Sequence, residues 1–145
     1  MLGWRGLDYN PIAGWSMIMM GESLMAERFD PATIEGYHAH IYYDEGSRET
    51  AAHIREQLEQ NFAVEMGRWR DQPVGPHPIS MYQVKFAPNE FPRIVPWLML
   101  NRAELTVLVH PETGDAYADH AHHALWLGQK LQLRLDILRR GTTTG

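Results

Sequence analysis

The chain contains no cysteine. This absence excludes disulfide bonds, thiolate catalysis, iron–sulfur clusters and every zinc site that is built from cysteine. Any metal ion that the protein binds must therefore be held by histidine, aspartate or glutamate side chains.

The sequence also lacks clustered positive charge and long hydrophobic runs. Its formal net charge is -5 and it has no dense run of lysine or arginine. Proteins that bind nucleic acid or anionic membranes usually have clustered positive charge, and this sequence lacks it. The one stretch that could suggest targeting, residues 15–20, is too short to span a bilayer. We therefore expect a soluble, cytoplasmic protein with no nucleic-acid or membrane partner.

What is present is the composition of one globular domain. The 145 residues are 44% hydrophobic and 21% charged, as in proteins that fold around a single core. Residues 1–35 have neither helical nor strand periodicity, and we interpret them as an N-terminal arm that is flexible or packs on a partner subunit. Residues 36–140 are the predicted folded domain, and residues 141–145 form a polar tail.

Regular periodicity begins at Gly36 and predicts an α+β fold. We expect strands over residues 36–43, 64–69, 80–86 and 105–110. Helices are expected after Ser47 for about four turns and over residues 88–102. This order of elements is that of a ferredoxin-like antiparallel sheet with helices on one face. The other face must then be covered, for example by a second subunit or a ligand cavity.

The C-terminal part of the chain predicts an addition to this fold. After a turn with the sequence HPETGD, residues 117–128 have the pattern of a short helix that ends at glycine. Residues 131–137 alternate between apolar and polar side chains, which is typical of a strand. We therefore expect an extra C-terminal helix and strand.

Histidines are the most informative polar residues. The chain has eight, and five of them lie in the words HAH (residues 38–40) and DHAHH (residues 119–123). Because side chains two apart in a strand share a face, His38 and His40 can present their imidazoles side by side. In a ferredoxin-like sheet the strand that ends at His110 is the antiparallel neighbour of the first strand. His110 should therefore lie near His38, on the face opposite the helices.

Imidazole is a good ligand for Fe, Zn, Cu and Ni, and two histidines with one carboxylate suit non-haem Fe(II) oxygenases. Asp115 and Asp119 lie near the histidines in the sequence, but an all-histidine site is equally compatible.

Simpler interpretations exist for several of these residues. His53 is expected to be solvated on a surface helix, and His77 can support a turn in a proline-rich loop. The short helix can place three polar side chains on a solvent-exposed face, namely Asp119, His122 and His123.

Three segments carry a resemblance to a known family: YHAHIYY (residues 37–43), PVGPHP (residues 73–78) and LVHPETGDAYADHAHHALWLG (residues 108–128). They resemble, in this order, the DOPA 4,5-dioxygenase family of aromatic ring-cleaving enzymes. The resemblance implies a ferredoxin-like fold, a homodimer, and extradiol cleavage of a catechol such as DOPA by non-haem Fe(II) and O2. Zinc or another divalent metal could replace iron in a purified sample.

The resemblance also implies which residues form the site. Our working division assigns the metal to His38, His40 and His110. It assigns acid/base chemistry or substrate contact to His77 and His120. His77 begins the third strand, far from the other histidines, so only a loop that folds back would bring it into the site.

Two other functions are compatible with the sequence. One is a cofactor-free monooxygenase-like protein of the dimeric α/β barrel type, which would be active without metal. The other is a non-catalytic domain that binds a metal or an aromatic ligand, which would bind tightly without consuming oxygen.

Overall fold

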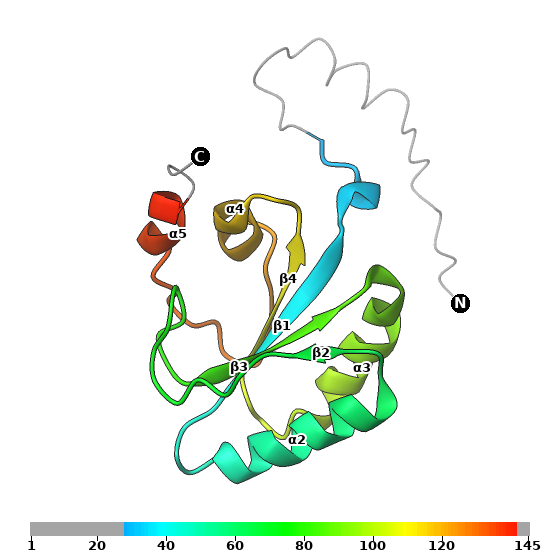
Figure 1. The fold of residues 1–145 in the computed structure, drawn as a ribbon, viewed down its shortest axis with the longest axis vertical. Coiled ribbons are helices and arrows are strands. Elements are labelled where there is room, and N and C mark those ends of the chain that lie inside the picture. Colours follow the sequence, from blue (N-terminus) through cyan, green and yellow to red (C-terminus); the bar gives the residue numbers. More distant parts are fainter. Residues whose placement is uncertain (1–27, 142–145) are drawn as a thin grey trace, which may run out of the picture. The chain divides into compact units, whose positions relative to one another are not determined.

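The computed structural model describes residues 28–141 and shows a five-stranded antiparallel sheet between two layers of other elements (Figure 1). The strand order is β2-β3-β1-β4-β5. The strands are β1 (Gly36–Tyr42), β2 (Glu65–Met66), β3 (Met81–Phe86), β4 (Val107–Glu112) and β5 (Leu125–Leu127). The α-helices are α2 (Arg48–Asn61), α3 (Phe91–Asn101), α4 (Ala116–Ala121) and α5 (Asp136–Gly141), and short 3-10 turns are η2 (Pro31–Thr33) and η3 (Pro88–Glu90).

The order of the elements from β1 to β4 confirms the predicted fold class. Strand, helix, two strands, helix and strand follow one another, and β1 lies between β3 and β4, antiparallel to both. This is the ferredoxin-like arrangement, and β5 extends the sheet beyond β4.

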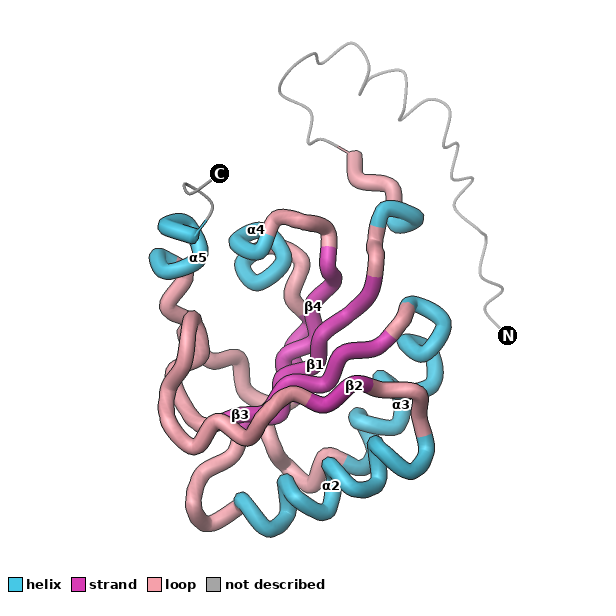
Figure 2. The backbone as a smooth tube through the Cα atoms, in the orientation of Figure 1, coloured by secondary structure: helices cyan, strands magenta, loops and turns pink. Residues whose placement is uncertain are grey.

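One face of the sheet and two helices enclose the main hydrophobic core. Helices α2 and α3 lie together on this side (Figure 2). Their apolar positions recur at helical spacing, so that each helix presents one stripe to the sheet. The core includes Ala39, Ile41, Val84, Val107 and Val109 from the strands, and Ala51, Ile54, Leu58, Ile94 and Leu98 from the helices.

The opposite face of the sheet is covered in part by the chain itself. Helices α4 and α5 lie on that side (Figures 1 and 2). A smaller apolar cluster of Tyr42, Met81 and Leu108 packs there against Trp126 and residues from two loops. These loops precede β3 and follow β5, and the covering that the fold requires therefore comes at least partly from within one subunit.

The strand predicted over residues 131–137 is wrong. Residues 129–134 are an extended loop without strand pairing, and α5 begins at Asp136. The alternation is nevertheless real, because Leu131 and Leu133 pack against the small apolar cluster while Gln132 and Arg134 are exposed. A segment that lies flat on a sheet buries every second side chain without joining the sheet. The added strand is instead β5, and the helix before it is shorter than predicted.

The compact unit that contains the sheet begins at Ala32. Most of the N-terminal arm and all but the first residue of the C-terminal tail lie outside the described residues, so both interpretations stay predictions. None of the helices within residues 28–141 has the length and apolar character needed to cross a membrane.

Candidate metal centre

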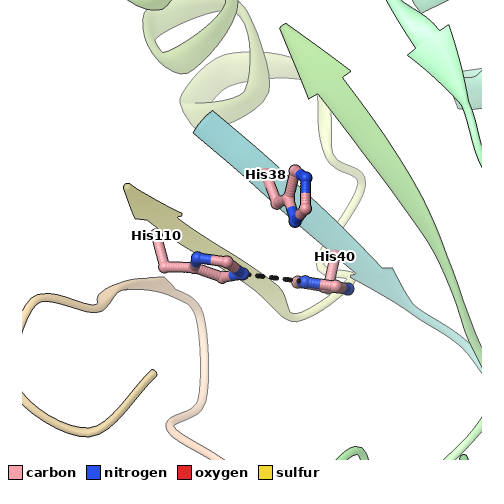
Figure 3. Close-up of side chains that lie close together, drawn as sticks. All are labelled: His38, His40 and His110. Atoms are coloured by element: carbon pink, nitrogen blue, oxygen red, sulfur yellow. Dashed lines mark hydrogen bonds between the residues drawn. The ribbon is translucent and has the colours of Figure 1, made fainter. Parts of the chain in front are cut away.

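The pairing of β1 with β4 brings three predicted ligands together. His38 lies directly opposite His110 in the ladder, and His40 is two residues further along β1 on the same face. Figure 3 shows the three side chains side by side, two from β1 and one from β4. The prediction that His110 lies near His38 is confirmed, as is its place opposite the helices.

The nitrogens of these three histidines are close enough for a single ion. One nitrogen from each of His38, His40 and His110 lies within 4.8 Å of the other two. The Nε2 atoms of His40 and His110 are 3.1 Å apart. This contact is a hydrogen bond (Figure 3), and its length is also close to the roughly 3 Å that separates two adjacent ligands of one ion bound at about 2.0–2.1 Å.

His77 reaches the cluster because its loop folds back. Backbone bridges pair Arg70 with Met81 and Val74 with His77, so residues 70–81 form a narrow hairpin whose tip contains Gly75 at a φ of 53°. This left-handed conformation favours glycine. The ring of His77 lies 4.1 Å from that of His40, and the Tyr42 hydroxyl lies 2.6 Å from its Nδ1.

His120 completes the cluster from α4. Its ring centroid is 4.0 Å from that of His110, and it forms a second group of three with His40 and His77, again with nitrogens within 4.8 Å. All five predicted site residues are therefore brought together from four separate segments. His40 is common to both groups.

The remaining histidines lie outside this cluster. His53 is exposed on α2, as predicted, and His122 is exposed after α4. His123 is partly buried and belongs to neither group of three.

Neither aspartate considered from the sequence belongs to the two groups of three. Asp115 caps α4 by accepting a hydrogen bond from the Ala118 backbone N–H. The simpler interpretation, in which Asp119 lies on a solvent-exposed face, is wrong, because only 3% of the residue is exposed. Its carboxylate accepts hydrogen bonds from the N–H and hydroxyl of Thr113. It holds the turn between β4 and α4.

Backbone carbonyls fix the orientation of two imidazoles. Nδ1 of His110 donates to the Pro111 carbonyl at 2.9 Å, and Nδ1 of His120 donates to the Ala116 carbonyl at 2.7 Å. A carbonyl can only accept, so the Nε2 atoms of both neutral rings keep their lone pairs. Metal-binding histidines typically have such a partner on the other ring nitrogen.

A fully buried polar atom of the cluster, Nδ1 of His40, has no hydrogen-bond partner within the protein. His40 is 3% exposed, and its Nδ1 makes no hydrogen bond. Leaving a buried polar atom unsatisfied is costly, and such atoms often mark a functional site or a place that a ligand or ion fills. Together with the spacing and the all-imidazole donor set, this atom shows that the residues fit a divalent transition metal.

Burial keeps these histidines neutral. Desolvation, reinforced by neighbouring imidazoles, holds the pKa of His40 well below its usual value. Burial lowers the pKa of His77 to about 4 and that of His110 to about 3. The pKa values of His38 and His120 are also lowered, mainly by burial, although Glu112 opposes the shift at His38. Neutral imidazole is the form that binds metals.

Two residues of the site were not identified from the sequence. Glu112 lies 2.8 Å from Nε2 of His38 through its Oε1 atom. It follows His110 by two residues and so shares its face, but β4 extends into the segment that was interpreted as a turn. Tyr42 is four residues after His38 and so shares its face, whereas its bond to His77 depends on the folded loop.

Comparisons with known proteins agree with this site. The model of the Dopa 4,5-dioxygenase family matches residues 37–137. A 21.2 kDa protein of Botryotinia fuckeliana, described as uncharacterized, is 33% identical over 79% of this chain and 69% of its own length. A DOPA 4,5-dioxygenase of Amanita muscaria is 31% identical over 72% of this chain, and the match spans only 50% of that enzyme.

A solved structure is also similar. The crystal structure of a candidate dioxygenase from Nostoc punctiforme is 56% identical, with a TM-score of 0.77, and the match covers 78% of this chain and 98% of that one. The family match covers most of the folded region and contains all five histidines of the cluster. The chain belongs to the Dopa 4,5-dioxygenase family.

Proposed function

We propose that this protein is an extradiol dioxygenase that opens the ring of a catechol, such as DOPA or a related dihydroxyphenyl compound, with O2 and non-haem Fe(II). The observation that carries the proposal is the convergence of five neutral imidazoles on one face of the sheet. Membership of the family supports dioxygenase chemistry.

The group of three on β1 and β4 is the proposed iron site. His38, His40 and His110 supply three neutral nitrogens and leave further positions open to substrate, as in other non-haem iron oxygenases. When bound there, Fe(II) supplies Lewis acidity and the electron transfer that O2 chemistry requires.

His77 and His120 are the proposed acid/base residues. Ring opening of a catechol requires that a phenol proton is removed and later returned, and a neutral imidazole can do both. His77 is held through Nδ1 by the Tyr42 hydroxyl, which leaves Nε2 as the nitrogen for proton transfer. The buried Tyr42 stays protonated because desolvation raises the pKa of its hydroxyl. His120 also presents Nε2, and there this atom has the lone pair, because Nδ1 donates to the Ala116 carbonyl.

Apolar side chains border the cluster and limit access of water. Tyr42 and Trp126 stack with their ring centroids 6.0 Å apart, and Leu108 is fully buried beside them. A flat aromatic substrate suits such a wall because stacking and burial both stabilise it. The lower polarity also strengthens each hydrogen bond made inside the site.

The test is anaerobic loading of the protein with Fe(II), followed by air and DOPA, caffeate or protocatechuate. We expect oxygen consumption and a yellow ring-opened product, with loss of both in His38→Ala and His110→Ala at unchanged far-UV circular dichroism. Iron-loaded protein that consumes no oxygen with any of these catechols would exclude the proposed reaction.

A non-catalytic metal-binding domain is the second candidate, and the unpaired Nδ1 of His40 favours it equally. It predicts tight binding of a divalent metal without oxygen consumption. Activity that persists in metal-free protein and resists chelators would instead favour a cofactor-free monooxygenase.

We also propose that the protein forms a homodimer, as the family resemblance implies. Light scattering of the purified chain tests this, and a monomer mass at working concentrations would contradict it.

A further inference from the structure

The geometry points to Glu112 as a positioning residue that fixes His38 so that this histidine binds a metal through Nδ1. This role rests on the proposed metal site and not on the ring-opening reaction. It concerns one contact, between Nε2 of His38 and Oε1 of Glu112 at 2.8 Å.

The strand ladder explains why this contact forms. Glu112 is the last residue of β4 and shares the outer face with His110. The residue directly opposite Glu112 on β1 is Gly36, which has no side chain. The carboxylate can therefore lean diagonally to His38, at the distance of neighbouring pairs in an antiparallel sheet.

This hydrogen bond determines which nitrogen of His38 is free. An ionised carboxylate only accepts hydrogen bonds, so the proton of the neutral imidazole lies on Nε2 and the lone pair lies on Nδ1. His110, its partner across the ladder, has the opposite arrangement, with Nδ1 donating to a carbonyl. The two histidines therefore present different nitrogens to the ion.

Glu112 also brings a negative charge into direct contact with a histidine of the site. Both groups of three consist of histidine alone, and Asp119 is engaged with Thr113. Among the residues that the structure describes, Glu112 is the carboxylate within hydrogen-bond distance of a histidine of the cluster, His38. A carboxylate behind a ligand raises the basicity of the imidazole and orients its ring.

A substitution outside the three proposed ligands can therefore change the orientation of His38. His110 and His120 donate hydrogen bonds to backbone carbonyls. Replacing a side chain does not remove a backbone carbonyl. The partner of His38 is a side chain that is 32% exposed, so its replacement leaves the core intact.

The experiment measures binding of Co²⁺ and Zn²⁺ to the purified full chain by competition with a chelator. Loss of such a partner typically weakens binding about 10–100-fold, and we expect this for Glu112→Ala, with a changed visible spectrum of the Co²⁺ protein. Glu112→Gln keeps an accepting oxygen and should lose less. Glu65→Gln, an exposed acid on β2, is the matched control and should bind like the wild type.

Wild-type affinity in Glu112→Ala, together with weakened binding in His38→Ala, would overturn the role. If Glu112→Ala fails to fold, the tautomer of His38 in metal-free wild-type protein decides the question. Long-range ¹H–¹⁵N spectra should show the proton on Nε2, and a proton on Nδ1 would overturn the inference. Metal binding that depends on Glu112 in a protein that opens no catechol would support this role and reject the dioxygenase proposal alone.

Discussion

The two faces of the sheet differ sharply although the same strands form both. Toward α2 and α3, β1 and β4 present only apolar side chains such as Ala39, Ile41 and Val109, and packing satisfies them. Toward α4 and the C-terminal loop, the alternate residues include His40 and His110, which are equally buried but polar. One face therefore supplies stability, and the other retains binding capacity at a cost in stability.

The largest expected effect is the loss of metal binding when a histidine on the outer face of the sheet is replaced. His40→Ala should abolish turnover and weaken metal binding by at least about 100-fold, because this histidine belongs to both groups of three and removal of a ligand exceeds the loss of its partner. Added metal should raise the Tm of the wild type but not that of the variant. His53→Ala, exposed on α2, should behave like the wild type in both assays.

Acid should destabilise the histidine face of the metal-free protein. Below about pH 6.5 the histidines of the unfolded chain bind protons, whereas the buried imidazoles of the folded protein stay neutral because burial lowers their pKa values. The free energy of unfolding therefore falls as the pH falls. The pKa values of about 4 for His77 and about 3 for His110 set the lower ends of this window. Each group contributes up to about 1.4 kcal/mol per pH unit. Urea unfolding between pH 8 and 4 measures the slope, which His77→Gln should reduce.

A core substitution should change stability without changing the site. Leu58→Ala removes a fully buried side chain of α2 and should lower the free energy of unfolding by about 2–5 kcal/mol. The metal affinity of the folded fraction should stay that of the wild type. Leu100→Ala, at a residue that is 87% exposed, should change stability by less than about 0.5 kcal/mol. A large loss of metal affinity in Leu58→Ala would show that the faces are not separable.

The smallest expected effect concerns the contact between Tyr42 and His77. Tyr42→Phe removes one hydrogen bond, worth about 0.5–1.5 kcal/mol, and should lower kcat by up to about 10-fold. Metal affinity should be unchanged because the ligands are untouched. If kcat is unchanged with an authentic catechol substrate, His77 does not depend on this hydroxyl.

Periodicity was enough to predict the parts of the site that lie in strands. Residues two apart share a face, and the ferredoxin-like topology makes the strand that ends at His110 the neighbour of the first strand, so His38, His40 and His110 could be placed together from the sequence. The rule that residues two apart share a face also places Glu112 beside His110. The proline after His110 and the sequence TGD after Glu112 indicated a turn instead, so the strand was expected to end at His110.

Parts of the site that lie in loops could not be predicted in this way. His77 enters because Gly75 adopts a positive φ and two backbone bridges close a hairpin, and neither follows from local pattern. The strand predicted over residues 131–137 failed for a related reason. Alternation reports burial of every second side chain, which Leu131 and Leu133 achieve by lying on the sheet face.

The central position of β1 has a consequence for how such proteins diversify. β1 has a hydrogen-bonded strand on each side, so the spacing of His38 and His40 is set by the pleat of the sheet and resists change. His77 comes from a hairpin tip, and Val74, Leu131 and Leu133, which pack on the same face, come from connecting segments, where insertions and exchanges are tolerated. Relatives with different aromatic substrates are therefore expected to differ in these outer segments while the frame that carries the imidazoles stays the same.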